Sequence, residues 1–220
     1  YTSFGQDAVR LADETDDRAL QTAQRNWVIY GMLFSGRLQE ARTLARETLE
    51  NYPHTGSDPS VLMGVDCLWS MHLAIAVTSA LLGETDNFHE SFALSRERCG
   101  NDPELNAFND AMGSIVANVF GRFDQALALA HRGIDGAETK GTAYCRCMTR
   151  QALSLSLFNH GEFHRAAEFA GEALSIMEEQ NTGRAHLGGV AGVLSLAELA
   201  LGDAGAARSR SSETIVFCHE

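Results

Sequence analysis

Apolar residues recur along the chain at every third or fourth position, which is the spacing of one face of an α-helix. One such stripe of small and apolar side chains runs through residues 38–49, and a second runs through residues 163–177. No run alternates apolar and polar residues between hairpin-type turns, so a sheet is not indicated. The pattern predicts an all-α protein.

A glycine turn interrupts the helical stripes at regular intervals. Four segments share a Gly that is followed by Ala five residues later, and they read LFSGRLQEA, NVFGRFDQA, FNHGEFHRA and LALGDAGAA. A fifth, ALLGETDNF, has Phe88 in place of the Ala. The turn glycines are Gly36, Gly83, Gly121, Gly161 and Gly202, at intervals of 47, 38, 40 and 41 residues. A fixed period of about 20–50 residues is the signature of a repeat array, in which each unit buries its apolar face against its neighbours.

The residue types at the turn have separate physical reasons. Gly adopts a positive φ without steric cost, so it ends the first helix of each unit in the left-handed cap conformation. The small residues that follow allow two antiparallel helices to approach closely, and they are Ala41, Ala126, Ala166 and Ala207. Phe88 leaves two alternatives: the larger ring pushes apart the two helices of the second repeat, or the alignment of the repeat pattern slips at this position.

The first helices of the units are more uniformly apolar than the second ones, which is typical of helices covered on several sides. They are expected near residues 17–34, 60–82, 104–120, 142–159 and 185–201. Asp58-Pro59 and Asp102-Pro103 each supply an N-cap acceptor and a proline at the first helical position. The predicted repeats span residues 17–52, 58–99, 102–137, 141–180 and 183–218, and residues 1–16 are expected to be the tail of a preceding repeat.

With the Gly-to-Ala spacing, the aromatic residue beside the turn and Pro53 in LENYP, the chain resembles the tetratricopeptide repeat (TPR) family over nearly its whole length. Its units are longer than the usual 34 residues and lack the family's Trp near the start of each first helix, so an extended variety is implied. The resemblance implies a single domain, a right-handed α–α superhelix of about five helix-turn-helix repeats.

The segment that begins AVRLADETDD is similar in style to repeats that follow nucleotide-binding domains in bacterial signalling proteins. These are large ATP-dependent LuxR-type regulators of the maltose-regulator kind and ATPase-linked relatives of adenylate cyclases. This resemblance implies a module of a signalling or transcriptional regulator. Because the chain starts at Tyr1, in what looks like the middle of a repeat, we expect it to be a fragment of a larger protein.

In such a superhelix the first helices line the concave face, which holds peptides or small ligands. The co-chaperone members of the family bind a partner's terminal carboxylate through Lys and Arg, and the lysines are missing here, so we reject that role. The candidate concave-face residues are Asn26, Tyr30, Phe34, Leu73, Val77, Phe108, Asn118, Arg150, Gln151, Leu155, Phe158 and Asn159.

Charge and composition limit the classes of binding partner and the cellular compartment that we expect. The net charge of −12 disfavours direct binding to nucleic acid or to an anionic membrane. The longest uncharged apolar run, residues 67–83, is too short to span a bilayer and predicts a buried helix. Five dispersed cysteines, an odd number, favour a reducing cytoplasm. Lys140 is the only lysine, a skew that suggests the base composition of a bacterial genome.

Two histidines and two cysteines are close enough in sequence to suggest chemistry. His160 and His164 flank Gly161, which ends a helix, so they would not share a helical face, and we predict no metal site. Cys145 and Cys147 lie on different faces of one helix and are expected to be small packing residues. No phosphate-binding loop, HExxH or G-x-S-x-G motif is present in the sequence, so we predict neither a catalytic activity nor a bound cofactor.

Four arginines cluster in the third and fourth units, and they are Arg122, Arg132, Arg146 and Arg150. A solvated helix face with acidic partners is the favoured interpretation, and a patch for an anionic ligand is the alternative.

The sequence therefore predicts a noncatalytic module that binds a protein, a peptide or a small-molecule effector. The alternative is a scaffold that self-associates into a homodimer, since Ile215, Val216 and Phe217 leave apolar surface at the last helix.

Overall fold

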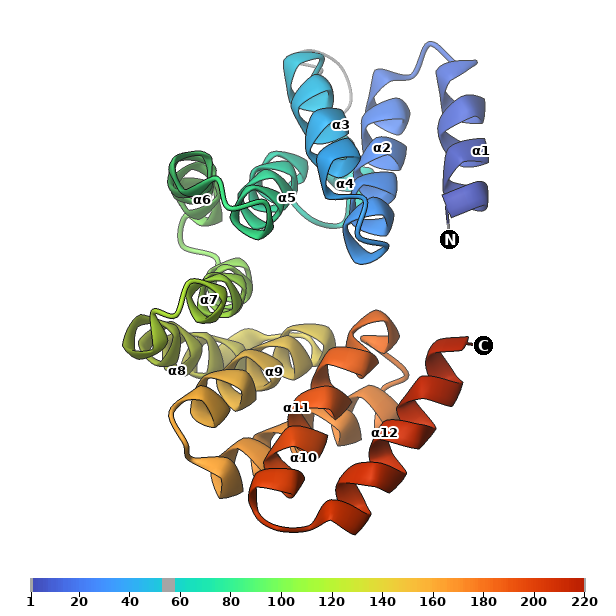
Figure 1. Cartoon of the computed structure of the whole chain (residues 1–220). Coiled ribbons are helices and arrows are strands. Elements are labelled where there is room, and N and C mark those ends of the chain that lie inside the picture. Colours follow the sequence, from blue (N-terminus) through green and yellow to red (C-terminus); the bar gives the residue numbers. More distant parts are fainter. Residues whose placement is uncertain (1, 53–57, 220) are drawn as a thin grey trace. The chain divides into compact units, whose positions relative to one another are not determined.

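The computed structural model describes residues 2–52 and 58–219, with side chains for 4–52 and 58–216. All regular elements in these ranges are helices, as the sequence predicts (Figure 1). Pro53 and the side chain of Phe217 lie outside what is described. The helices are α1 Thr2–Asp13, α2 Arg18–Phe34, α3 Leu38–Glu50, α4 Pro59–Met63, α5 Cys67–Leu81, α6 Thr85–Cys99, α7 Pro103–Val119, α8 Phe123–Lys140, α9 Ala143–Asn159, α10 Phe163–Glu179, the 3₁₀-helix η1 Arg184–His186, α11 Leu187–Ala200 and α12 Ala204–His219.

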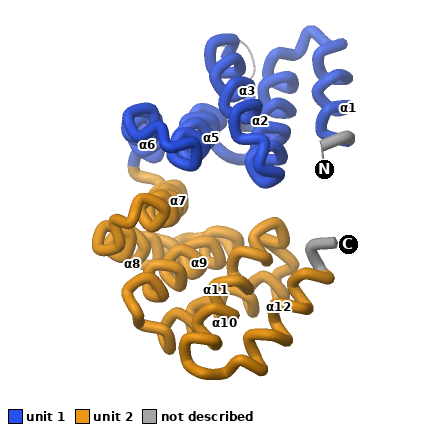
Figure 2. Tube along the Cα trace, viewed as in Figure 1, with its two compact units in different colours: residues 1–100 blue, residues 101–220 orange. Residues whose placement is uncertain are grey.

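The chain divides into two compact units, residues 1–100 and 101–220 (Figure 2). The division falls between the second and third predicted repeats. Unit 1 has a core around Ile29, Ala41 and Ala74, contributed by α2, α3 and α5. Unit 2 has its own cores, one of which gathers Met148 and Val190 from α9 and α11. Each unit therefore buries its own apolar residues.

All five predicted turn glycines adopt the left-handed conformation, with φ between 69° and 91°. At Gly161, the backbone N–H of Gly161 donates to the carbonyl of Phe158, and that of Glu162 donates to the carbonyl of Leu157, both at 2.9 Å. The same pair of hydrogen bonds recurs at the other four turns. These are Schellman caps, which satisfy the last carbonyls of the first helix. The turn prediction is confirmed at every position.

The residue five positions after each turn glycine is buried in all five turns. Phe88 occupies the same register as the alanines, because its backbone N–H donates to the carbonyl of Glu84 as that of Ala41 donates to Arg37. The register-slip alternative is therefore wrong. The Phe88 ring is buried and stacks on Phe92, with centroids 5.2 Å apart.

The two helices of each hairpin pack against each other, and within each compact unit the first helices of successive hairpins also contact each other. In unit 1, α2 contacts both α3 and α5, and α5 contacts α6. In unit 2, α9 contacts α7, α8, α10 and α11. The prediction that first helices are covered on several sides is confirmed for α5, which buries most of its residues.

The predicted continuous helix over residues 60–82 is wrong, because it is two helices. Gly64 ends the short α4 with a φ of 70°, and Asp66 starts α5 by accepting a hydrogen bond from the backbone N–H of Trp69 at 2.8 Å. The predicted caps at Asp58 and Asp102 are confirmed, since each carboxylate accepts from the backbone two residues later at 2.9 Å. The third hairpin ends at Lys140, three residues beyond its predicted end.

Among the described helices, none has both the length and the apolar character that crossing a membrane would require.

Candidate binding surfaces

In unit 1, two of the candidate concave-face residues join α2 to α5. Asn26 is fully buried and its Nδ2 donates to Oγ of Ser70 at 3.1 Å. The Tyr30 hydroxyl donates to the carbonyl oxygen of Ser70, also at 3.1 Å. Burial raises the pKa of Tyr30 to about 12, so the phenol is neutral. Both side chains are used in helix packing.

The other candidates of unit 1 differ in exposure. Phe34, at the end of α2, is 48% exposed, with its ring 6.3 Å from that of Tyr30. Leu73 is buried in α5, and Val77, one turn later, is half-buried. Of this group, Phe34 offers the most surface to a partner.

In unit 2, a polar seam joins α7 to α9 at the candidates Asn118 and Asn159. Nδ2 of Asn118 donates to Ser156 Oγ at 2.9 Å, and Oδ1 of Asn118 accepts from Nδ2 of Asn159 at 2.8 Å. Ser114 and Ser156 share a hydrogen bond of 2.9 Å between their hydroxyls. Because these groups satisfy one another in a buried place, the seam fixes how the two helices align.

Three rings form a row at the helix starts of unit 2: Phe108 on α7, Tyr144 on α9 and His186 in η1, directly before α11. Phe108 stacks on Tyr144 with centroids 5.6 Å apart, and the Tyr144 hydroxyl lies 3.0 Å from Nε2 of His186. Burial lowers the pKa of His186 to about 4, so its ring is neutral near pH 7. Only Phe108 was predicted from the sequence. Tyr144 and His186 could have been found from the recurrence of a ring near the start of each of these helices.

The remaining apolar and amide candidates lie on α9. Phe158 packs against the core of unit 2 and lies 5.5 Å from the Phe163 ring, and Leu155 is half-buried. Gln151 approaches α11 closely, since a Cβ on Gly189 would come within 2.7 Å of its amide nitrogen. Its buried Oε1 has no hydrogen-bond partner among the described residues.

Arg150 is held between two carboxylates, at 2.8 Å from Glu138 and 2.7 Å from Glu172. It therefore links α9 to α8 and α10. Arg132 likewise makes two hydrogen bonds to the buried carboxylate of Asp110, at 2.9 and 3.1 Å. Both cations are already neutralised within unit 2 by their own neighbours.

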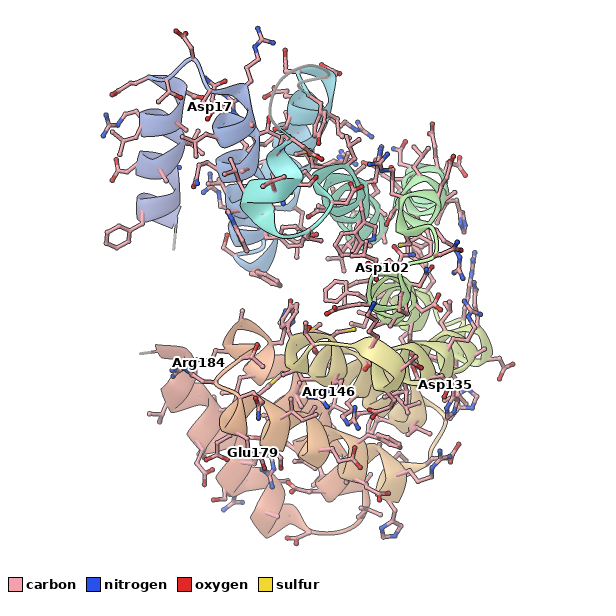
Figure 3. All side chains as sticks on the ribbon, turned by 180° about the vertical axis from the view of Figure 1, so that it is seen from behind. Asp17, Asp102, Asp135, Arg146, Glu179 and Arg184 are labelled. Carbon is pink, nitrogen blue, oxygen red and sulfur yellow. The ribbon has the colours of Figure 1, made fainter. Side chains whose placement is uncertain are left out.

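The other two arginines lie apart from these ion pairs. The guanidinium of Arg122 lies 5.8 Å from the centroid of the Phe120 ring. Arg146, labelled on α9 in Figure 3, has a buried Nε with no hydrogen-bond partner among the described residues.

The cysteine and histidine pairs are separated by the fold. Cys145 and Cys147 are buried in α9, and burial raises the pKa of their thiols to about 12 and about 11, which makes them poor nucleophiles. His160 caps the end of α9, with Nε2 3.6 Å from Asp124, whereas His164 belongs to α10. Over the described ranges, no group of three His, Cys, Asp or Glu side chains could hold a metal ion.

Two cavities were not predicted from the sequence. One of about 560 Å³ in unit 1 is polar and lies among α1, α2 and α3. One of about 520 Å³ in unit 2 lies where the end of α10 meets η1, α11 and α12. Its lining combines apolar side chains with charged ones of both signs. The lining of the second cavity comprises Leu174, Met177, Glu178, Asn181, Arg184, Leu187, Ala191, Arg210, Glu213 and Thr214.

Neither a protein-family model nor a curated protein sequence matches the chain. Among solved structures, it is similar to the crystal structure of BtubC (BKLC) from P. vanneervenii, with a TM-score of 0.64 and 16% sequence identity. That likeness covers 99% of this chain and 89% of the BtubC chain. At this level of identity it bears on the fold alone.

Proposed function

We propose that the chain is a noncatalytic recognition module, a right-handed TPR-like superhelix within a bacterial cytoplasmic regulator of signalling or transcription. The observation that carries this proposal is the recurrence of one turn. Five glycines make the same two cap hydrogen bonds, and each is followed five residues later by a buried residue. Arrays of such hairpins present long surfaces on which ligands bind.

The place that we assign to a ligand is the unit 2 cavity, because its lining has more apolar side chains than that of the unit 1 cavity. Its volume of about 520 Å³ suits a small molecule or the side chains of a short peptide segment. Leu174, Met177 and Leu187 supply apolar contact, while Glu213 offers a carboxylate and Arg210, already paired with Glu198, offers a guanidinium edge. This combination favours an amphipathic ligand with an apolar body and a polar end.

The concave-face candidates play a supporting part in this proposal. Asn26, Leu73 and Asn118 are buried, so they would set helix alignment rather than touch the ligand. Phe34 and the half-buried Phe108 remain accessible to a partner. Ligand binding would be transmitted through small changes in how successive hairpins stack.

The test is a thermal-shift screen of a metabolite set and a peptide library, repeated on a variant with the cavity filled. Thr214→Trp places an indole in the cavity from a half-buried rim position, whereas Ser211→Trp adds it at an exposed position of the same helix outside the lining. A true ligand raises the melting temperature of the wild type and of Ser211→Trp but not of Thr214→Trp. No stabilising compound, or one that stabilises all three proteins equally, would refute this site.

A further inference from the structure

Within each compact unit, successive first helices contact each other, and α9 makes such contacts on two faces, with α7 and with α11. Asn118, three positions before Gly121 on α7, bonds to Ser156 and Asn159, which stand five and two positions before Gly161 on α9. We call the face that contacts the next first helix in the chain the following face. It consists of the residues ten, six and three positions before the turn glycine of its own helix. We call the face that contacts the previous first helix the preceding face, and it consists of the residues nine, five and two positions before that glycine.

The preceding face is covered in α5, α9 and α11 but open in α2. In the three covered helices the residues nine and five positions before the turn glycine are all buried, and they are Ala74, Thr78, Ala152, Ser156, Val193 and Ala197. In α2 the same positions are Trp27, which is 59% exposed, and Gly31, where an added Cβ would meet nothing within 4 Å. The exposed ring of Trp27 therefore lies next to open space at Gly31.

The following face is open in α11. Leu196 and Leu199 are 51% and 55% exposed, whereas their counterparts on α9, Leu155 and Phe158, are half-buried. The third position of this face is Gly192, which also has open space around it. Two large apolar side chains are thus uncovered where other first helices receive a neighbour.

A second observation at α11 is independent of the leucines. Ser195 is buried, 7% exposed, and its hydroxyl has no hydrogen-bond partner among the described residues. Ser114, the counterpart of Ser195 on α7, shares its hydrogen bond with the hydroxyl of Ser156 on the next first helix. A buried hydroxyl without a partner is costly. The two counterparts satisfy theirs differently, Ser114 through the next first helix and Ser154 on α9 through the carbonyl of Ala166 in its own hairpin. The exposed leucines therefore carry the inference at α11.

We propose that the chain associates head to tail, with the following face of α11 in one copy docking on the preceding face of α2 in a second copy. By the register of α7 and α9, Leu199 of the first copy lies over Gly31 and Phe34 of the second, and Leu196 lies beside Trp27. A second copy is the occupant because one chain carries both halves of the contact. The chain also forms this kind of contact internally three times, between α2 and α5, α7 and α9, and α9 and α11.

The contact is heterologous, so assemblies of several copies either close into a ring or keep an open face at each end to which further copies add. Every copy carries a formal charge of −12, and long-range repulsion opposes association. Added salt screens that repulsion without weakening the apolar contact. Association is therefore expected to increase with ionic strength. This inference does not depend on the ligand cavity, which has a different lining on α11.

Sedimentation velocity over a concentration series, at low and high salt, tests the proposal. The wild-type sedimentation coefficient rises with concentration, and more steeply at high salt. Trp27→Glu and Leu199→Glu each abolish the rise, because either charge would be buried at the contact. Val61→Glu is the matched control, since Val61 is 81% exposed on α4, outside both faces. Circular dichroism melts establish that all the variants are folded.

A mixture of the two face variants separates head-to-tail docking from symmetric pairing. Trp27→Glu keeps an intact α11 face and Leu199→Glu keeps an intact α2 face, so an equimolar mixture forms a dimer and nothing larger. If Trp27→Glu alone still dimerises, the pairing is symmetric and the proposal is wrong. A wild type that stays monomeric at all concentrations and salts also overturns it; the open faces would then belong to a different occupant, such as another repeat of a longer chain.

Discussion

At the scale of single residues, replacing either of two glycines in one hairpin by alanine is expected to change the free energy of unfolding in opposite directions. Gly161 has a φ of 78°, whereas Gly171 is within α10, and an added Cβ meets nothing within 4 Å at either position. We expect Gly161→Ala to lower the free energy of unfolding by about 1–2 kcal/mol through left-handed strain. Gly171→Ala should raise it by about 0.5–1 kcal/mol through helix propensity. Urea unfolding measures both, and equal effects of the two substitutions would contradict the cap assignment.

His186 gives a second residue-scale prediction, on pH dependence. Its folded pKa of about 4 lies below the ordinary value of 6.5, so between these values the unfolded chain takes up a proton that the folded chain does not. The free energy of unfolding therefore falls as the pH drops from 6.5 to 4, by an amount on the order of 1–3 kcal/mol. His186→Gln should remove this part of the pH dependence in denaturation measured at pH 7, 5.5 and 4. Identical profiles for the two proteins would show that His186 titrates normally.

At the level of single residues, the sequence predicts the positions where the local backbone conformation requires a particular residue type. It does not predict side-chain contacts with residues that are distant in the sequence. A glycine at a positive φ is recognisable because other residues are strained there, so all five turns could be found. Counting back from the turns identified Asn26 but could not show that Ser70, 44 residues away, would bury and satisfy it. Similarly, Tyr144 and His186 form a pair only because the fold brings two helix starts together.

At the scale of elements, Phe88 shows where a repeat pattern is a poor guide to stability. The other four turns carry Ala at its position, so the pattern alone suggests that Phe88→Ala would be tolerated. The ring is buried and stacks on Phe92, so its removal leaves a cavity. We expect a loss of about 3–5 kcal/mol in the free energy of unfolding, measured by urea denaturation. A loss below about 1 kcal/mol would indicate that α6 closes onto α5 in the variant.

The break between α4 and α5 shows why helix boundaries were harder to predict than helix existence. Residues 60–82 are mostly apolar, and hydrophobic periodicity does not reveal that Gly64 adopts a φ of 70° there. The signal was present in Asp66, which is both the charge that closes the apolar run and the N-cap of α5. Capping chemistry thus outweighed the apolar pattern at this point.

At the scale of the whole molecule, stability is distributed along the chain. Cores such as those around Ile29 and Met148 are each contained within one unit, and helices contact their neighbours in the chain order. In the proposed repeat array, a local change in stability spreads only to adjacent repeats. A protein with a single closed core would instead respond everywhere at once.

Native-state hydrogen exchange, compared between the wild type and Gly161→Ala, tests this account most directly. Gly161 connects α9 to α10, so the substitution should speed amide exchange in these two helices and, to a lesser extent, in α8 and α11. Exchange in α2, α3 and α5 should remain at the wild-type rate. A uniform acceleration across all helices would contradict the proposed repeat architecture, and with it the proposed recognition module.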